Sequence, residues 1–211
     1  MNVSPTFHPL DPLSAAEFTA TADLLAQQHD VSAPDWRLAA IELIEPAKDL
    51  VAAFEQGGAA PDRIVGVNAL ERATNRTYRA RLSLSRNEVI SFEHLPDVQV
   101  NFTVDEWEEA DAALRAHPDV IAALAKRGIT DLSLVFMDTW TYGAAVIPEE
   151  YKGRRVGWSD TWVRSEPGAN PYAGPVNGFH CIIDVNTMEL LAIEDTFSVE
   201  KPNVMGEYVP R

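Results

Sequence analysis

The hydrophobic and polar positions along the chain repeat one scheme twice: a capped helix followed by strand-like segments. Ser14-Ala-Ala-Glu17 and Thr103-Val-Asp-Glu106 both fit the capping box, in which the hydroxyl and the carboxylate satisfy each other's backbone N–H groups. The first box predicts a helix that ends near residue 29. Helical spacing places Phe18, Ala22 and Leu25 on the face of this helix that we expect to be buried.

The second capping box leads into a helix with the same kind of apolar stripe, formed by Trp107, Ala110 and Leu114. A shorter helix is predicted directly after it, over residues 119–127. Proline precedes this segment and glycine follows it, which is the asymmetry typical of helix ends.

Strand-like segments follow each helical region. Residues 76–85 alternate apolar and polar side chains, as a half-buried antiparallel strand does. A brief helix is also predicted over residues 47–55. The expected strands are residues 36–44, 63–70, 76–85, 88–94, 132–139, 154–164, 179–185 and 189–194.

This order of elements predicts an α+β fold with two tandem small domains, each a helix packed on an antiparallel sheet. We place the joint near residues 96–102, which gives a first domain over residues 1–97 and a second over residues 98–211. A helix wrapped by such a sheet is also the arrangement of cystatin-like inhibitors. Their Gln-x-Val-x-Gly loop is missing, because residues 99–103 read Gln-Val-Asn-Phe-Thr.

The net charge and the cysteine content limit the binding partners and the cellular compartment that we expect for this protein. The formal net charge of −15 repels nucleic acid and anionic membrane surfaces, so we expect neither as a partner. Cys181 is the single cysteine and cannot form an intrachain disulfide. The sequence has no secretory signal pattern and no apolar run of about 20 residues, so a cytoplasmic location is expected.

The residue types that carry chemistry do not gather in the sequence. No two of the five histidines lie at a spacing that puts both on one helix or strand face. His180 and Cys181 are neighbours on a predicted strand and should point to opposite faces. Neither a nucleophile elbow nor a glycine-rich phosphate loop is present. We therefore predict no catalytic, cofactor-binding or metal-binding residue in this chain.

Two charge clusters have alternative explanations. Five carboxylates over residues 105–111 are explained by the helix dipole, which stabilises acidic side chains at a helix start, or less simply by a cation site. The basic group Lys152, Arg154 and Arg155 is interpreted as a solvated loop or as a grip for a partner's carboxylates.

Several stretches, in order, resemble copper amine oxidases that contain topaquinone, a class that includes primary-amine and tyramine oxidases. The resemblance covers the second and third N-terminal domains of that family and nearly the whole chain. It is carried by residues 8–17, 36–46 (ending Glu-Leu-Ile-Glu-Pro), 119–129, 138–143 (Asp-Thr-Trp-Thr-Tyr-Gly), 154–155, 170–175 (Asn-Pro-Tyr-Ala-Gly-Pro), 183–188, 193–195 and 206–210.

The resemblance implies a non-catalytic domain pair of an enzyme that converts primary amines to aldehyde, ammonia and hydrogen peroxide. Copper and topaquinone would belong to a catalytic β-sandwich domain of the parent chain, on which this pair would pack, and the parent would be a homodimer. The family's His-x-His copper pair and its Asn-Tyr quinone motif are absent here. We expect a fragment of a longer enzyme; the alternative is a free-standing cystatin-like binding module.

The resemblance also implies which residues border the amine substrate channel. Thr139 replaces the family's usual proline, so the local turn is expected to differ. Trp107 and Trp140 have an alternative interpretation as core residues. An apolar docking patch is expected at the tail over residues 197–210 and around Trp140 and Tyr172. The residues implied for the channel are Trp107, Asp138, Thr139, Trp140 and Tyr172.

Overall fold

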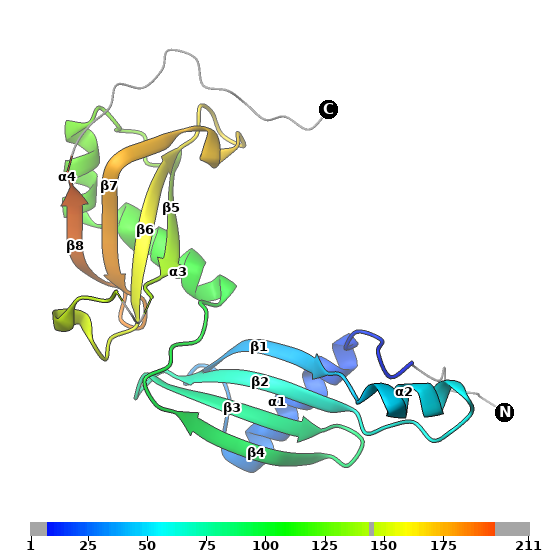
Figure 1. Ribbon diagram of the computed structural model, residues 1–211. Helices are drawn as coiled ribbons and strands as arrows, with labels where there is room; N and C mark the ends of the chain where they lie inside the picture. The colour runs from blue at the N-terminus through cyan, green and yellow to red at the C-terminus, as the bar shows by residue number, and fades with distance from the viewer. Residues whose placement is uncertain (1–7, 144–145, 197–211) are drawn as a thin grey trace. The chain divides into compact units, whose positions relative to one another are not determined.

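The computed structural model describes residues 8–143 and 146–196, and the chain divides into two compact units between Val100 and Asn101 (Figure 1). The elements of the first unit are α1 (Ala15–His29), β1 (Trp36–Ile44), α2 (Lys48–Glu55), β2 (Ile64–Glu71), β3 (Arg76–Ser83) and β4 (Glu88–Leu95). The second unit contains α3 (Val104–Ala116), α4 (Pro118–Lys126), β5 (Val135–Thr141), η1 (Glu149–Tyr151), β6 (Val156–Val163), η2 (Pro171–Ala173), β7 (Pro175–Asp184) and β8 (Glu189–Asp195).

The first unit is a four-stranded antiparallel meander, β1-β2-β3-β4, with α1 lying across one face (Figure 1). The capping box predicted at the start of α1 is present, with Ser14 and Glu17 bonded to each other's backbone. Arg63, which directly precedes β2, donates from Nε to Oε1 of Glu17 at 2.7 Å. The helix start is therefore tied to the second strand of its own sheet.

The buried face of α1 differs from the predicted stripe. Phe18 is 41% exposed, whereas Thr21, Leu24 and Leu25 face the sheet. Threonine is accepted in this core because its hydroxyl donates to the carbonyl of Glu17 at 2.7 Å and leaves no unsatisfied group. The apolar pattern thus predicted the helix correctly, but the face that it predicted to be buried was wrong by part of a helical turn.

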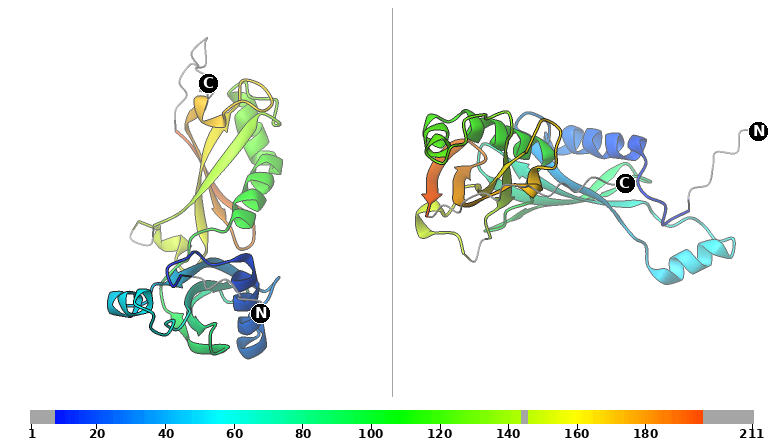
Figure 2. Two further views of the ribbon diagram at one scale, coloured as in Figure 1. Left: turned by 90° about the vertical axis from the view of Figure 1, so that its right-hand side faces the viewer. Right: turned by 90° about the horizontal axis from the view of Figure 1, so that it is seen from above.

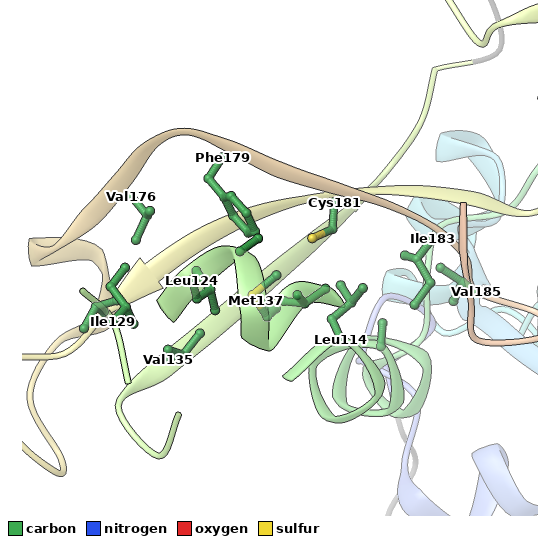
Figure 3. Close-up of a cluster of buried hydrophobic side chains, with 14 residues drawn as sticks. Leu114, Leu124, Ile129, Val135, Met137, Val176, Phe179, Cys181, Ile183 and Val185 are labelled. Carbon is green, nitrogen blue, oxygen red and sulfur yellow. The ribbon is translucent and has the colours of Figure 1, made fainter. Parts of the chain in front are cut away.

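The second unit repeats the arrangement with sheet order β5-β6-β7-β8, and all neighbouring strands are antiparallel. Helices α3 and α4 lie on one face of this sheet only (Figure 2). Side chains of α3, α4 and the inward face of β5 and β7 meet in one core that includes Leu114, Leu124, Met137, Phe179 and Cys181 (Figure 3). The predicted α+β fold, with helix on antiparallel sheet in each unit, is confirmed.

Three strands of the second unit begin at different residues from those expected, and β6 starts at Val156 rather than at residue 154. β5 starts at Val135 rather than at residue 132, because Ser133 is held in a turn by two hydrogen bonds to Oδ1 of Asp131. β7 starts at Pro175 rather than at residue 179, since proline is tolerated as the first residue of a strand. Among the described residues, the helices are too short or too polar to cross a membrane.

Candidate functional site

A buried ion pair fixes the start of α3 to the second sheet. Glu106, in the capping box of α3, and Arg155, directly before β6, are 0% and 1% exposed. Arg155 donates from Nε and Nη2 to the two oxygens of Glu106 at 2.5 and 3.0 Å. Nη2 also donates to the carbonyl of Asn101 at 3.1 Å, and the ring of Phe102 lies 4.7 Å from the guanidinium carbon. The pair therefore joins the helix start, the segment before it and the sheet.

The electrostatics of this pair keep Glu106 ionised. Burial alone raises the pKa of Glu106, but the hydrogen bonds and charge of Arg155 act in the opposite direction. The backbone N–H and the hydroxyl of Thr103 also donate to this carboxylate, at 2.8 and 3.0 Å. The net effect is a pKa of Glu106 below its usual value.

Sequence reasoning missed the structural roles of several charged residues. Two of the carboxylates explained by the helix dipole have specific partners. One is Glu106; the other is Asp111, which accepts from the backbone N–H of Met137 at 2.9 Å and pairs with Arg115 at 2.7 Å. Both earlier interpretations of Arg155, a solvated loop residue and a grip for a partner, are wrong because its side chain is buried against Glu106.

An aromatic cluster surrounds a second buried carboxylate, Asp138, at the outward face of β5. The indole N–H of Trp107 donates to Oδ1 of Asp138 at 3.0 Å. The ring of Trp107 packs edge-on against Phe136, with 5.0 Å between centroids. Tyr172 contacts Phe136 at 5.8 Å and Trp162 at 5.1 Å, both edge-on. Together these rings leave Asp138 only 3% exposed.

Tyr172 is positioned by the short helix η2 and by Asp138. The side chain of Asn170 accepts from the backbone N–H of Tyr172 at 3.1 Å and caps η2. Burial, the charge of Asp138 and a hydrogen bond to its carboxylate raise the pKa of the Tyr172 phenol. Asp138 therefore accepts from the indole N–H of Trp107 on α3 and acts on the phenol of Tyr172 on η2 through its charge.

Strand register explains why these side chains share one face. Because Val135 and Met137 point into the core, the alternate residues of β5 point away from the helices. The register places the three outward residues of β5 opposite outward residues of β6: Phe136 opposite Trp162, Asp138 opposite Asp160, and Trp140 opposite Trp158.

The outward row continues onto β7 with His180. Its ring stacks on Trp158 at 4.4 Å, and its Nδ1 lies 3.1 Å from Asp160. Cys181 points into the core and is fully buried, so the predicted opposite orientation of these neighbours is confirmed. Across residues 8–143 and 146–196, no group of three or more His, Cys, Asp or Glu side chains is arranged to hold one metal ion.

A groove of about 540 Å³ runs between the start of α3 and the end of β5. Its walls are residues 101–104, Trp107 and residues 139–141. The methyl group of Thr139 lies against Gly157. A Cβ atom added at residue 157 would be only 2.5 Å from this methyl carbon. The glycine therefore allows β5 and β6 to place Thr139 in this wall.

The structure brings the five residues implied for the channel into one region of the second unit. Trp107, Thr139 and Trp140 line the groove, whereas Asp138 and Tyr172 belong to the adjoining aromatic cluster. Trp140 is 60% exposed and Tyr172 is 49% exposed, so the alternative interpretation of Trp140 as a core residue is wrong. The tail over residues 197–210 lies outside the described residues. A role in a substrate channel stays a prediction.

Comparisons with known proteins match both units. The family description "Copper amine oxidase, N2 domain" matches residues 8–91, and "Copper amine oxidase, N3 domain" matches residues 105–207. The primary amine oxidase of Arthrobacter sp. (strain P1) is 36% identical over 97% of this chain and 31% of its own length. A copper-containing diamine oxidase of Nicotiana tabacum is 31% identical over 96% of this chain and 30% of its own length.

Solved structures agree at the level of fold. The copper-containing benzylamine oxidase from Hansenula polymorpha superimposes with a TM-score of 0.75 at 21% identity, over 97% of this chain and 34% of that one. This chain spans about a third of the length of the relatives it matches. Two consecutive domain matches, in family order and covering both described units, show that the chain belongs to the copper amine oxidase family as its N2 and N3 domains.

Proposed function

We propose that this chain is the non-catalytic N2–N3 pair of a copper-dependent primary-amine oxidase, which converts primary amines to aldehyde, ammonia and hydrogen peroxide. The observation that carries this proposal is the consecutive match to the N2 and N3 domains over nearly the whole chain. The names of the relatives, a primary amine oxidase and a diamine oxidase, support an amine substrate.

The residues that the structure describes do not fit a copper site. The part of the chain that the structure describes holds no cluster of three metal-ligating side chains. Cys181 is also unsuited to metal binding there, because burial raises the pKa of its thiol to about 12 and metals bind the thiolate. Copper and topaquinone therefore belong to the remainder of the parent enzyme in this proposal, and no chemical step is assigned to this chain.

The proposed contribution of this chain is to shape the amine path and to pack on the catalytic domain. Large exposed apolar side chains favour coverage by another protein surface, and Trp140 and Tyr172 provide them on the outward side of the second unit. The cluster around Asp138 adds aromatic rings and a negative charge, which suit the passage of a cationic amine. We propose that Trp107 and Thr139 border this path as well.

The test is to express the gene beyond codon 211 and compare its product with the 211-residue chain, both supplied with copper under air. The longer protein should bind copper, stain for quinone and release peroxide with primary amines; this chain alone should do none of these. A reading frame that ends at residue 211, or peroxide release by this chain with stoichiometric copper, would contradict the proposal. Size-exclusion chromatography and cell fractionation of the longer protein test the predicted homodimer and cytoplasmic location.

A further inference from the structure

We propose that Asn177 is a site of spontaneous chemical modification, at which its side-chain amide is converted through a cyclic imide to aspartate and isoaspartate. Asn177 and Gly178 form the single Asn-Gly pair in the sequence. Asparagine is a thermolabile residue, and glycine has no Cβ atom to hinder attack by its own peptide nitrogen. The pair lies on β7 in the second unit, and the proposal does not depend on the function proposed above.

The pairing of β7 with β6 is interrupted at this position. Asp160 is paired with His180 and Trp162 with Pro175, so residues 176–179 all lie opposite one residue of β6. Such a bulge leaves the extra residues outside the regular ladder. The Asn-Gly pair therefore lies in a stretch of strand that the neighbouring strand does not hold in the regular extended conformation.

The directions of the neighbouring side chains show the same irregularity. Val176 and Phe179 both point into the core, although they are three positions apart and would face opposite sides of a regular strand (Figure 3). Gly178 has a φ of 70°, a conformation that glycine adopts readily. Asn177 is exposed to solvent. Its side chain is therefore free of the core packing that would prevent it from turning toward the next peptide nitrogen.

A guanidinium group is placed to activate that nitrogen. Arg127, the residue that caps the end of α4, donates from Nη1 to the carbonyl oxygen of Asn177 at 2.9 Å. Asp195 and the ring of Phe179 hold this guanidinium, and the arginine side chain is only 7% exposed. When the N–H of Gly178 loses its proton, the negative charge spreads to the carbonyl oxygen of the same peptide group. A fixed cationic donor at this oxygen stabilises the charge and favours the attack.

The reaction needs water as its only co-reactant. The nitrogen of Gly178 attacks Cγ of Asn177, so that a C–N bond forms while the bond from Cγ to Nδ2 breaks. The proton from the attacking nitrogen leaves with the amide group as ammonia. Water then opens the five-membered imide at either of its carbonyl carbons. One opening gives aspartate; the other gives isoaspartate, in which the main chain runs through the former side chain.

The products act on the contact between α4 and β7. Arg127 also donates from Nη2 to the carbonyl of Gly178 at 3.0 Å, so both carbonyls of the Asn-Gly pair accept from one side chain. Isoaspartate lengthens the main chain and displaces these carbonyls relative to each other. Aspartate instead adds a second carboxylate near an arginine that already pairs with Asp195. The isoaspartate form should therefore melt at a lower temperature than the unmodified chain.

The experiment is to age the complete 211-residue chain in mildly alkaline buffer at body temperature and to map its peptides by mass spectrometry. The mass gain from amide to carboxylate is followed at each asparagine, and an isoaspartyl methyltransferase detects isoaspartate. Asn87 is the internal comparator, because it is exposed and has a positive φ but is followed by glutamate. Arg127→Gln removes the cationic donor. Arg154→Gln is the matched control, because it removes another ion-paired arginine of the second unit.

The expected result is that Asn177 converts faster than Asn87 in the folded chain. Arg127→Gln should slow this conversion at least about fivefold, whereas Arg154→Gln should react as the parent does. The direction is informative: if Arg127 only held the bulge in place, its loss would loosen the backbone and speed the conversion. In concentrated urea the parent and Arg127→Gln should react at equal rates, because the contact is then absent.

The proposal is overturned if Asn177 stays unmodified while Asn87 converts, or if Arg127→Gln reacts as fast as the parent or faster. A slowing that persists in urea would also overturn it, since the effect would then be independent of the fold. Arg127→Lys makes the same test should Arg127→Gln fail to fold, because it keeps the charge and removes the planar donor group. Its rate should lie below that of the parent, and an equal or higher rate would contradict the role of the guanidinium.

Discussion

Replacing Glu106 with glutamine should destabilise the second domain by roughly 3–5 kcal/mol, the range found when one partner of a buried ion pair is removed. The carboxylate of Glu106 accepts four hydrogen bonds, two from Arg155 and two from Thr103. Glutamine keeps the shape but offers one acceptor oxygen and turns a donor toward existing donors. Arg155 is then left as a charge that is 1% exposed and has lost its carboxylate.

Urea unfolding followed by tryptophan fluorescence measures this loss, because four of the five tryptophans lie in the second unit. The matched variants are Arg155→Met and the double substitution. If the pair is the source of the effect, the double variant should be more stable than the sum of the two losses predicts, by about 1–3 kcal/mol. A loss below about 1 kcal/mol for Glu106→Gln, or strictly additive losses, would refute this reasoning.

The same pair makes the second domain sensitive to acid. The pKa of Glu106 is lower in the folded protein than in the unfolded chain, where it is near 4.5. The contribution of Glu106 to stability is therefore complete above the unfolded pKa and is lost as the pH falls through the folded pKa. Stability should therefore decline below about pH 4.5 in the parent chain. In Glu106→Gln this decline should be smaller, because the titrating group is gone.

Three further predictions concern other positions. Glu17→Gln should cost roughly 1 kcal/mol in the first domain, because its pair with Arg63 is partly exposed, and fluorescence of the second domain should not change. Gly157→Ala should lower the unfolding free energy of the second domain by about 1–3 kcal/mol, since its Cβ would lie 2.5 Å from Thr139; an unchanged melting temperature would contradict this. Cys181 should react with a thiol reagent only as urea unfolds the protein, because it is fully buried and its pKa is raised to about 12; rapid native labelling would contradict this.

Local sequence patterns predicted the parts of the fold that depend on neighbouring residues. Both capping boxes formed as expected, because each uses residues only three positions apart. The arginine partners of these boxes lie 46 and 49 residues further along the chain, and no local pattern links them. The predicted buried face of α1 was wrong for a similar reason. Packing against the sheet determines which residues of the helix are buried, and Phe18 is not one of them.

The candidate site was predicted from the family resemblance and not from periodicity. Trp107 and Asp138 are 31 residues apart, so only the folded chain shows that one donates to the other. An aspartate on a strand gives no signal that it will be buried among rings. The groove was missed as well, since it forms where a helix start meets a strand end.

The two structural findings depend on each other, because the ion pair holds the walls of the groove. Glu106 points inward to Arg155, and the next residue, Trp107, is thereby directed to the edge of β5, where it reaches Asp138. The guanidinium of Arg155 also lies against Phe102, another wall of the groove. Loss of the pair would let the helix start and this ring move together. The charge pair therefore contacts two walls of the groove, Phe102 and Thr103, so Glu106→Gln should shift the indole N–H signal of Trp107 in NMR spectra even under conditions where the domain stays folded.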